Sequence, residues 1–124
     1  MTDIHLPHDH GQVSHRIAEH LPNEETFKNV TEQLRLLGDV SRLKIFWILC
    51  HCEECVINLS VMMDMSSPAV AHHLKMLKTA GLVTTRREGK EVYYKAAVTD
   101  HAAALHGMVE RLMIITCPHE TEYS

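Results

Sequence analysis

Apolar side chains recur at helical spacing in several segments between residues 23 and 116, with polar residues between them. Asn23 can cap a first helix, Asp39 a second and Thr99 a last one, and a short third helix is expected from about Val56 to Met63. The residues expected on the apolar faces are Phe27, Val30, Leu34 and Leu37 in the first helix, Val40, Leu43, Phe46, Trp47 and Leu49 in the second, and Leu105, Met108, Val109, Leu112 and Ile115 in the last. The second helix is so apolar that we expect it at the centre of the domain.

A further helix is predicted after Met65. Ser66 or Ser67 can be its N-cap, Pro68 suits the first helical turn, and Gly81 ends the helix. Its buried face is expected to hold three residues at the i, i+4, i+7 spacing, which are Val70, Leu74 and Leu77. The turn at residues 64 and 65, before this helix, has the length found in helix-turn-helix motifs.

Two runs of residues suited to β-strands follow this helix, from Leu82 to Arg87 and from Glu91 to Lys95. The connection at residues 88–90 contains Gly89, which permits a tight hairpin. A helix-turn-helix followed by a hairpin predicts a mainly α fold with a small β-hairpin wing, the winged helix-turn-helix.

Positive charge is concentrated in the same segment. Six basic and two acidic residues lie between Ser66 and Lys95, so this segment carries +4, whereas the whole chain carries −4 at pH 7. A basic segment in an acidic protein suits a phosphate backbone, although a solvated basic face is the alternative. Nucleic acid is therefore the first partner to consider.

The length of 124 residues favours a single domain with an arm. We expect a His-rich, flexible arm at residues 1–22, a DNA-binding and dimerisation domain at 23–117 and a tail at 118–124. No apolar run approaches the ~20 residues of a membrane span, and the N-terminus has no export signal. These features predict a cytoplasmic protein without a membrane partner. In that reducing compartment, the four cysteines are expected to be metal ligands, redox sensors or core residues rather than disulfides.

The first and last helices carry more apolar surface than a core of this size can absorb. A homodimer would cover that surface, and its two-fold axis would place two recognition helices on two half-sites of an operator. A packed monomer is the alternative.

Three motifs, in order, carry a resemblance to a known family. The chain contains GDVSRLKIFWIL at 38–49, SSPAVAHHLKMLKTAGLV at 66–83 and RREGKEVYY at 86–94. Over about residues 25–116 they resemble the second helix, recognition helix and wing of the ArsR/SmtB family of winged-helix metalloregulators. The sequence has no Gly-rich phosphate loop and no acid-base or nucleophile constellation, so we expect no enzyme and no small-molecule substrate. The resemblance implies a dimeric transcriptional repressor. Such a repressor binds double-stranded operator DNA when free of ligand and releases it when a metal ion or another inducer binds.

Residues that face away from the core of the recognition helix are candidates for contacting DNA. They are Ser66, Ser67, Pro68, His72 and Lys75, and the wing adds Arg86, Arg87 and Lys90. Their polar side chains can bond to phosphates or base edges, and the wing can reach the backbone or the minor groove. Because Arg86 and Arg87 alternate across the strand, one of them can be merely solvated. His73 falls on the buried side and is expected to be a hydrogen-bonded core residue.

A cysteine-rich stretch at the junction of the second and third helices is the candidate metal site. Cys50, His51, Cys52 and Cys55 lie within six residues, and Cys117 can join them from the same or the opposite subunit. Thiolates favour Zn²⁺ or a thiophilic ion such as Cd²⁺, Pb²⁺, cuprous copper or As(III). A buried Cys50, with Cys52 and Cys55 as ligands or redox thiols, is an equal alternative to three ligands.

The ligand positions of the family are only partly kept. Many members have Cys-Val-Cys-Asp at the third helix, and the positions of its two cysteines and its aspartate correspond to Cys55, Ile57 and Asn58. The four positions of the family's second site hold Val98, Asp100, Arg111 and Ile114. Further candidate ligands are His5, His8 and His10 of the arm, and His106 with Glu110 at i, i+4 on the last helix. Adventitious binding by the arm and solvated helix polarity are the alternatives.

Two other functions remain open. A repressor of the same fold could use its cysteines as a thiol or persulfide switch, in which Cys52 and Cys55, or one of them and Cys117, form a reversible bond. A thiol-disulfide oxidoreductase built on the Cys-x-x-Cys pair is a remote alternative, because such enzymes carry the pair at a helix start that follows a strand.

Overall fold

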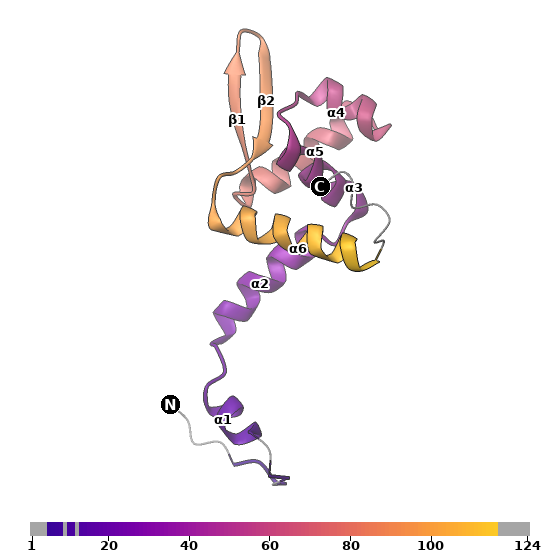
Figure 1. Cartoon of the computed structure of the whole chain (residues 1–124). Helices are drawn as coiled ribbons and strands as arrows, with labels where there is room; N and C mark the ends of the chain where they lie inside the picture. Colours follow the sequence, from indigo (N-terminus) through magenta and orange to yellow (C-terminus); the bar gives the residue numbers. More distant parts are fainter. Residues whose placement is uncertain (1–4, 9, 12, 117–124) are drawn as a thin grey trace. The chain divides into compact units, whose positions relative to one another are not determined.

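Six helices and one two-stranded sheet make up the part of the chain that the structure describes (Figure 1). The structure is a computed structural model, and it describes residues 5–8, 10, 11 and 13–116. The chain divides into two compact units, residues 1–33 and 34–124. The expected tail at 118–124 and Cys117 lie outside the described residues.

The first unit contains a helix that the sequence did not indicate. Helix α1 spans Ser14–Glu19, and none of its residues is buried. With only six residues it is too short to show a helical repeat of apolar positions, which explains why residues 1–22 were expected to form an arm without regular structure. Helix α2, Glu24–Leu36, begins as predicted, since the backbone N–H of Thr26 donates to the Asn23 side chain at 2.9 Å.

The core of the second unit is built around α3, Val40–His51. Its Asp39 cap accepts a hydrogen bond from the backbone N–H of Arg42 at 2.9 Å, as the sequence predicts. The side chains of Ile45 and Phe46 are completely buried. Val40 is an exception to the expected apolar face, because it lies in the first turn and is 75% exposed.

Helices α4, Val56–Met63, and α5, Ser67–Thr79, form the predicted helix-turn-helix. The turn reverses at Asp64, whose φ of 53° is left-handed, and the N–H of Met65 donates to the carbonyl of Ser60 at 3.0 Å. Ser66 is the N-cap of α5 and accepts from the N–H of Ala69 at 3.3 Å. The predicted core face of α5 is confirmed, with Val70, Leu74 and Leu77 buried.

The wing is an antiparallel hairpin of β1, Val83–Glu88, and β2, Glu91–Ala96. Both strands lie within one residue of the predicted bounds, and Gly89 takes a positive φ of 62° at the turn. A short backbone bridge to Glu54 was not predicted. Glu54 and Tyr94 exchange two backbone hydrogen bonds of 3.0 and 2.8 Å, so the segment between α3 and α4 is fixed to the wing.

Helix α6, Asp100–Thr116, follows the wing and starts at the predicted Thr99 cap. Ala102, Leu105 and Val109 face the core. The rest of its predicted apolar face is exposed, namely Met108, Leu112 and Ile115. No helix among the described residues is long and apolar enough to cross a membrane.

Candidate functional site

Helix α5 presents a polar surface opposite its buried face. The candidate DNA-contacting residues of α5 and its cap are all exposed, namely Ser66, Ser67, Pro68, His72 and Lys75. Since α5 is the second helix of the helix-turn-helix, this is the face that such motifs insert into the major groove. The Ser66 hydroxyl already accepts a capping bond but can still donate its proton to a phosphate.

His73 points the other way and has the structural role expected for it. Its side chain is only 13% exposed, and the Arg42 guanidinium donates to its Nδ1 at 3.3 Å, while its Nε2 lies 4.0 Å from the Asp39 carboxylate. Burial lowers the pKa of His73 despite the opposing influence of Asp39. A neutral imidazole that accepts from Arg42 fits this environment, and it holds α5 against the start of α3.

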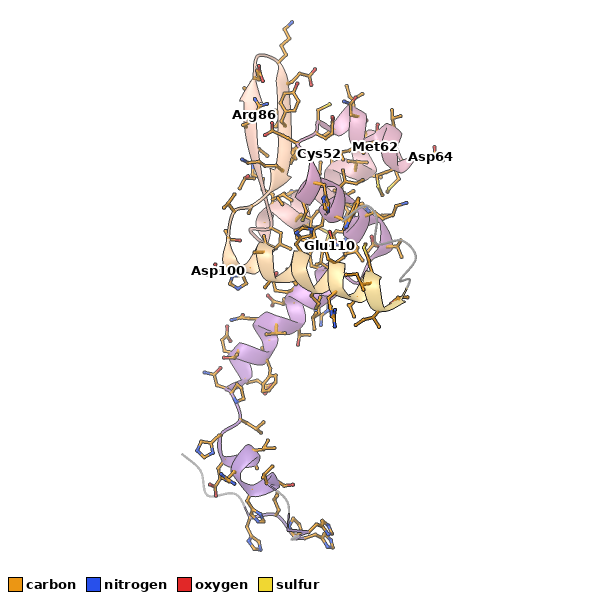
Figure 2. All side chains as sticks on the ribbon, in the orientation of Figure 1. Cys52, Met62, Asp64, Arg86, Asp100 and Glu110 are labelled. Carbon is orange, nitrogen blue, oxygen red and sulfur yellow. The ribbon has the colours of Figure 1, made fainter. Side chains whose placement is uncertain are left out.

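The two arginines of the wing differ in their partners. Arg86 donates to Glu53 at 2.8 Å and to Glu88 at 2.7 Å, and its guanidinium lies 4.6 Å from the centre of the Tyr93 ring. These contacts hold the Arg86 guanidinium on the protein's own carboxylates. Figure 2 shows Arg86 on the wing. Arg87 and Lys90 are exposed on the wing. The sequence alone did not indicate that Glu53 meets Arg86, because the two residues lie 33 positions apart.

The three described cysteines occupy different environments. Cys50 is half-buried, and burial together with the nearby Glu110 charge raises the pKa of its thiol to about 11. Cys52 is the exposed C-cap residue of α3, where its thiol donates to the carbonyl of Ile48 at 3.5 Å and burial again raises its pKa. Cys55 is the N-cap residue of α4. Two of the three thiols are therefore held in the protonated form at neutral pH.

A group of nitrogen and oxygen ligands lies beside Cys50, where α3 meets α6. His51 Nε2 and His106 Nε2 lie 3.0 and 2.9 Å from the same oxygen of Glu110, and 3.3 Å from each other. Hydrogen bonds from the two histidines hold the pKa of Glu110 below its usual value, although burial acts in the opposite direction. Among the described residues, these three form the group of ligand atoms that meet within 4.8 Å. The three described cysteines do not form such a group.

Aromatic contacts fix the orientation of the two imidazoles. The Trp47 ring lies 4.3 Å from the His51 ring, and the His51 and His106 rings meet edge to face at 5.0 Å between their centres. The sequence paired His106 with Glu110 at i, i+4 on the last helix, but it placed His51 only with the cysteines. His51 is 59 residues from Glu110, so spacing along the chain gave no sign that they meet.

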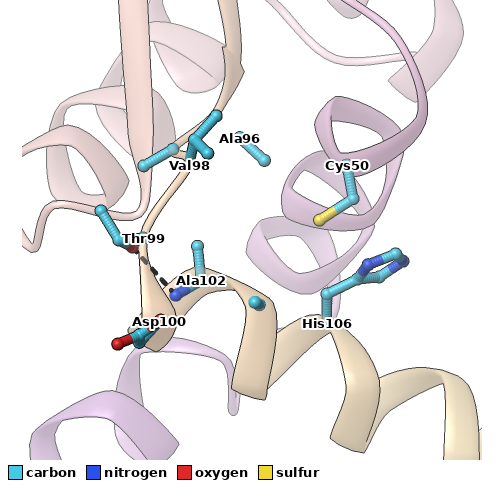
Figure 3. Close-up of a pocket in the computed structure, with 9 residues that line it drawn as sticks. Cys50, Ala96, Val98, Thr99, Asp100, Ala102 and His106 are labelled. Carbon is cyan, nitrogen blue, oxygen red and sulfur yellow. Dashed lines mark hydrogen bonds between the residues drawn. The ribbon is translucent and has the colours of Figure 1, made fainter.

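A cavity of about 440 Å³ lies next to this group (Figure 3). Its lining combines the Cys50 thiol of α3 and His106 of α6 with small residues of the loop after β2 and of the start of α6. The figure shows the Cys50 sulfur and the His106 ring on the same side of the cavity, across from Val98. The arm histidines belong to the first unit, where the rings of His8 and His10 stack at 5.8 Å.

Comparisons with known proteins identify the family. Residues 39–85 match the model of the bacterial regulatory proteins of the arsR family. The chain is 36% identical over 86 residues to the cadmium resistance transcriptional regulatory protein CadC of Listeria innocua, an alignment that covers 68% of this chain and 71% of that protein.

Solved structures agree with this relationship. The reduced form of HlyU from Vibrio cholerae is 31% identical, with a TM-score of 0.64, over 76% of this chain and 95% of that chain. A homodimeric winged helix-turn-helix DNA-binding domain from Mycobacterium bovis is 26% identical, with a TM-score of 0.63, over 81% of this chain and 89% of that chain. The chain thus belongs to the arsR family of bacterial regulatory proteins, which are DNA-binding transcriptional regulators with a winged helix-turn-helix fold.

Proposed function

We propose that this protein is a metal-responsive transcriptional repressor, which binds operator DNA as a homodimer and releases it when a metal ion binds. The observation that carries this proposal is the position of the segment 50–55, which is rich in ligand-type side chains. Glu54 of this segment is hydrogen-bonded to the wing, and His51 contacts Glu110 of α6. A ligand bound here would act on the DNA-binding element and on the last helix together.

The DNA-binding part of the proposal rests on α5 and the wing. The polar face of α5 would read the major groove through Ser67, His72 and Lys75, while Arg87 and Lys90 would contact the phosphate backbone. Arg86 has a different role, because its guanidinium is bonded to Glu53 and Glu88 in the free protein. Since DNA is the partner, we place the protein in the cytoplasm.

The homodimer rests on apolar surface that the monomer leaves exposed. Helix α2 exposes Phe27, Val30 and Leu34, each by about half, and α6 exposes a further apolar set, namely Met108, Leu112, Met113, Ile114 and Ile115. Exposed apolar side chains on two helices are typical of an interface between subunits. The related domain from Mycobacterium bovis is homodimeric. This supports the domain expected at residues 23–117, with DNA binding and dimerisation combined.

The metal response rests on the donor atoms at the end of α3 and on α6. Thiols, imidazoles and a carboxylate all occur there, a set suited to Zn²⁺ and, through sulfur, to Cd²⁺, Pb²⁺ or As(III). A relative is named for cadmium resistance. DNA is released if the metal ion binds more tightly to a conformation of the dimer in which the recognition helices are misplaced.

A titration of DNA affinity with metal tests the proposal. A pseudo-palindromic duplex selected in vitro with the reduced protein would serve as probe, and fluorescence anisotropy at fixed salt would report its affinity. We expect Zn²⁺ or Cd²⁺ to weaken binding by at least ~10-fold, the usual size of a coupling free energy of more than ~1 kcal/mol. Unchanged affinity at saturating Zn²⁺, Cd²⁺, Pb²⁺ and As(III) would refute the metal response.

The exposed thiol of Cys52 favours a second candidate, a thiol or persulfide switch in the same fold. One solved relative is described in its reduced form. Against this candidate, the raised pKa values of Cys50 and Cys52 leave little thiolate, the form that reacts with oxidants and persulfides. Mass spectrometry after polysulfide treatment, beside the anisotropy assay, would reveal a modified cysteine that releases DNA without metal.

A further inference from the structure

The three ligand atoms of His51, His106 and Glu110 have the spacing of the corners of a metal tetrahedron. Metal–nitrogen and metal–oxygen bonds of 2.0–2.1 Å in tetrahedral geometry separate neighbouring ligand atoms by about 3.3 Å. The observed separations are 2.9, 3.0 and 3.3 Å. Shifts of a few tenths of an ångström would bring all three atoms onto one ion. We propose that His51, His106 and Glu110 bind a single borderline divalent cation such as Zn²⁺ within one subunit.

Hydrogen bonds alone do not explain why these three side chains converge. Both Nε2 atoms face the same carboxylate oxygen, and they also face each other at 3.3 Å. If both carried protons, the two N–H groups would converge on one acceptor. A cation placed between the three atoms accepts the lone pairs of two neutral imidazoles and one carboxylate without any such conflict.

The protein holds these ligands ready before an ion binds. His106 and Glu110 are one helical turn apart on α6, so their side chains share a face. His51 comes from the last turn of α3, where the Trp47 ring packs against it. The side chains are also accessible, with 31% of His51, 32% of His106 and 19% of Glu110 exposed. Water can therefore complete the coordination as a fourth ligand.

The donor set selects a class of metal different from that of the cysteines. Two imidazoles and a carboxylate suit Zn²⁺, Co²⁺ or Ni²⁺, whereas As(III) and Pb²⁺ need sulfur. The Cys50 thiol beside the site is not needed as a ligand, because three protein ligands and one water make a complete tetrahedral set. The bound ion would join α3 to α6, the helix proposed for dimerisation. Its effect on DNA binding therefore rests on the proposed function.

Cobalt(II) binding by the reduced, full-length protein tests the site. Co²⁺ replaces Zn²⁺ in such sites and gives visible d–d absorption, and a thiolate ligand adds a charge-transfer band in the near ultraviolet. We expect one Co²⁺ per subunit with visible bands and without the thiolate band, and Zn²⁺ should displace it. The single Trp47, 4.3 Å from the His51 ring, should lose fluorescence as the paramagnetic ion binds.

Substitutions separate this site from the cysteines. His51→Gln, His106→Gln and Glu110→Gln should each weaken Co²⁺ binding by more than ~100-fold, since even the loss of groups that only orient ligands costs 10–100-fold. The variant with all four cysteines replaced by serine should keep the visible bands. His101→Gln is the matched control, because His101 is an exposed histidine of the same helix. Circular dichroism would verify that each variant folds.

The outcomes distinguish this inference from the proposed function. Co²⁺ binding that survives His51→Gln and His106→Gln but disappears with the cysteines would overturn the site, even if metal still releases DNA. Conversely, Co²⁺ binding that requires the two histidines, with a DNA affinity that none of Zn²⁺, Cd²⁺, Pb²⁺ and As(III) changes, would establish the site and refute the metal-responsive repressor. If both hold, His106→Gln should abolish release by Zn²⁺.

Discussion

His72 and His73 are neighbours in the sequence but have opposite environments. His72 is exposed on the face of α5 proposed to contact DNA, whereas His73 is hydrogen-bonded to Arg42 on the buried face. One step along a helix turns a side chain by about 100°, which is enough to separate a surface role from a structural one. Burial therefore separates their roles: we expect His72 to contact DNA and His73 to make the stability of the fold depend on pH.

Protonation of His73 is expected to destabilise the folded protein. Because burial lowers the pKa of His73 below the ordinary value of 6.5, the unfolded chain binds the proton more readily. The contribution of neutral His73 to the free energy of unfolding is complete above pH 6.5. It is lost as the pH falls below 6.5 towards the pKa of His73 in the folded protein. His73→Gln should lower the free energy of unfolding by about 1 to 2 kcal/mol at pH 7.5, because the hydrogen bond to Arg42 is lost. The decrease should be smaller at pH 5.5.

Urea unfolding of parent and variant between pH 5 and 8 measures this difference. His72→Gln is the control, because the two substitutions change the same side chain on the same helix and differ in burial. A His73→Gln penalty that is the same at pH 5.5 and pH 7.5 would argue against the lowered pKa. Thermal melts of the same samples would show whether folding stays cooperative.

At the scale of elements, local signals predict where four of the six helices in the described part of the chain start. Asn23, Asp39, Ser66 and Thr99 each cap a helix through a side-chain bond to the third residue along the chain. Such contacts depend only on nearby residues, so the sequence reveals them. Helix α1 escaped prediction because its six residues are too few to show a repeat, and none of them is buried.

Side-chain contacts between elements that are far apart in the sequence could not be predicted from it. The pairing of His51 with Glu110 and of Arg86 with Glu53 joins residues 59 and 33 positions apart. Each depends on how α3 and the segment after it pack on α6 and on the wing. The sequence identified the segment 50–55 as a metal-site candidate because of its cysteines, whereas the structure groups the imidazole of His51 with the His106 and Glu110 side chains of α6.

The wing should respond unequally to the removal of its basic residues. Each phosphate contact contributes about 0.9 to the slope of log affinity against log salt. Arg87→Ala and Lys90→Ala should each lower the slope by about one per bound subunit, as expected for side chains that contact phosphates. Arg86→Ala should change the slope by much less, because the Arg86 guanidinium is already ion-paired with Glu53 and Glu88.

Anisotropy titrations at several salt concentrations, with the selected duplex, give these slopes. Glu53→Gln supplies the complementary control, since it removes one of the two carboxylates on Arg86. That substitution should steepen the slope if Arg86 then turns to the phosphates. Equal slope changes for Arg86→Ala and Arg87→Ala would mean that the ion pairs of the free protein do not persist on DNA.

For the whole molecule, charge and apolar surface are divided between regions. The segment from Ser66 to Lys95 carries +4 within a chain of net charge −4, so the rest repels DNA. The large apolar side chains that are exposed lie outside this segment, most of them on α2, α4 and α6 and in the first unit. This separation suits a protein that contacts DNA with one surface and a second copy of itself with another.

Leu112→Glu is expected to disrupt the dimer and, with it, tight DNA binding. Leu112 is 52% exposed on α6 among other exposed apolar residues, so a buried carboxylate would replace it at the proposed interface. The fold should tolerate the change, because the core-facing residues of α6 are Ala102, Leu105 and Val109. Two linked recognition helices bind two half-sites with an effective concentration that a monomer lacks, so affinity for the palindromic duplex should fall by at least ~100-fold.

Sedimentation velocity over a range of concentrations, paired with anisotropy, measures both effects on one sample. Val98→Glu is the matched control, since it adds the same charge at a valine that is 92% exposed in the loop before α6. We expect Val98→Glu to remain dimeric and to bind DNA with less than ~10-fold loss, the size expected of a charge at a surface site outside the interface. If Leu112→Glu sediments as a dimer and binds as the parent does, α6 is not the dimerisation helix, and the exposed face of α2 alone would have to join the subunits.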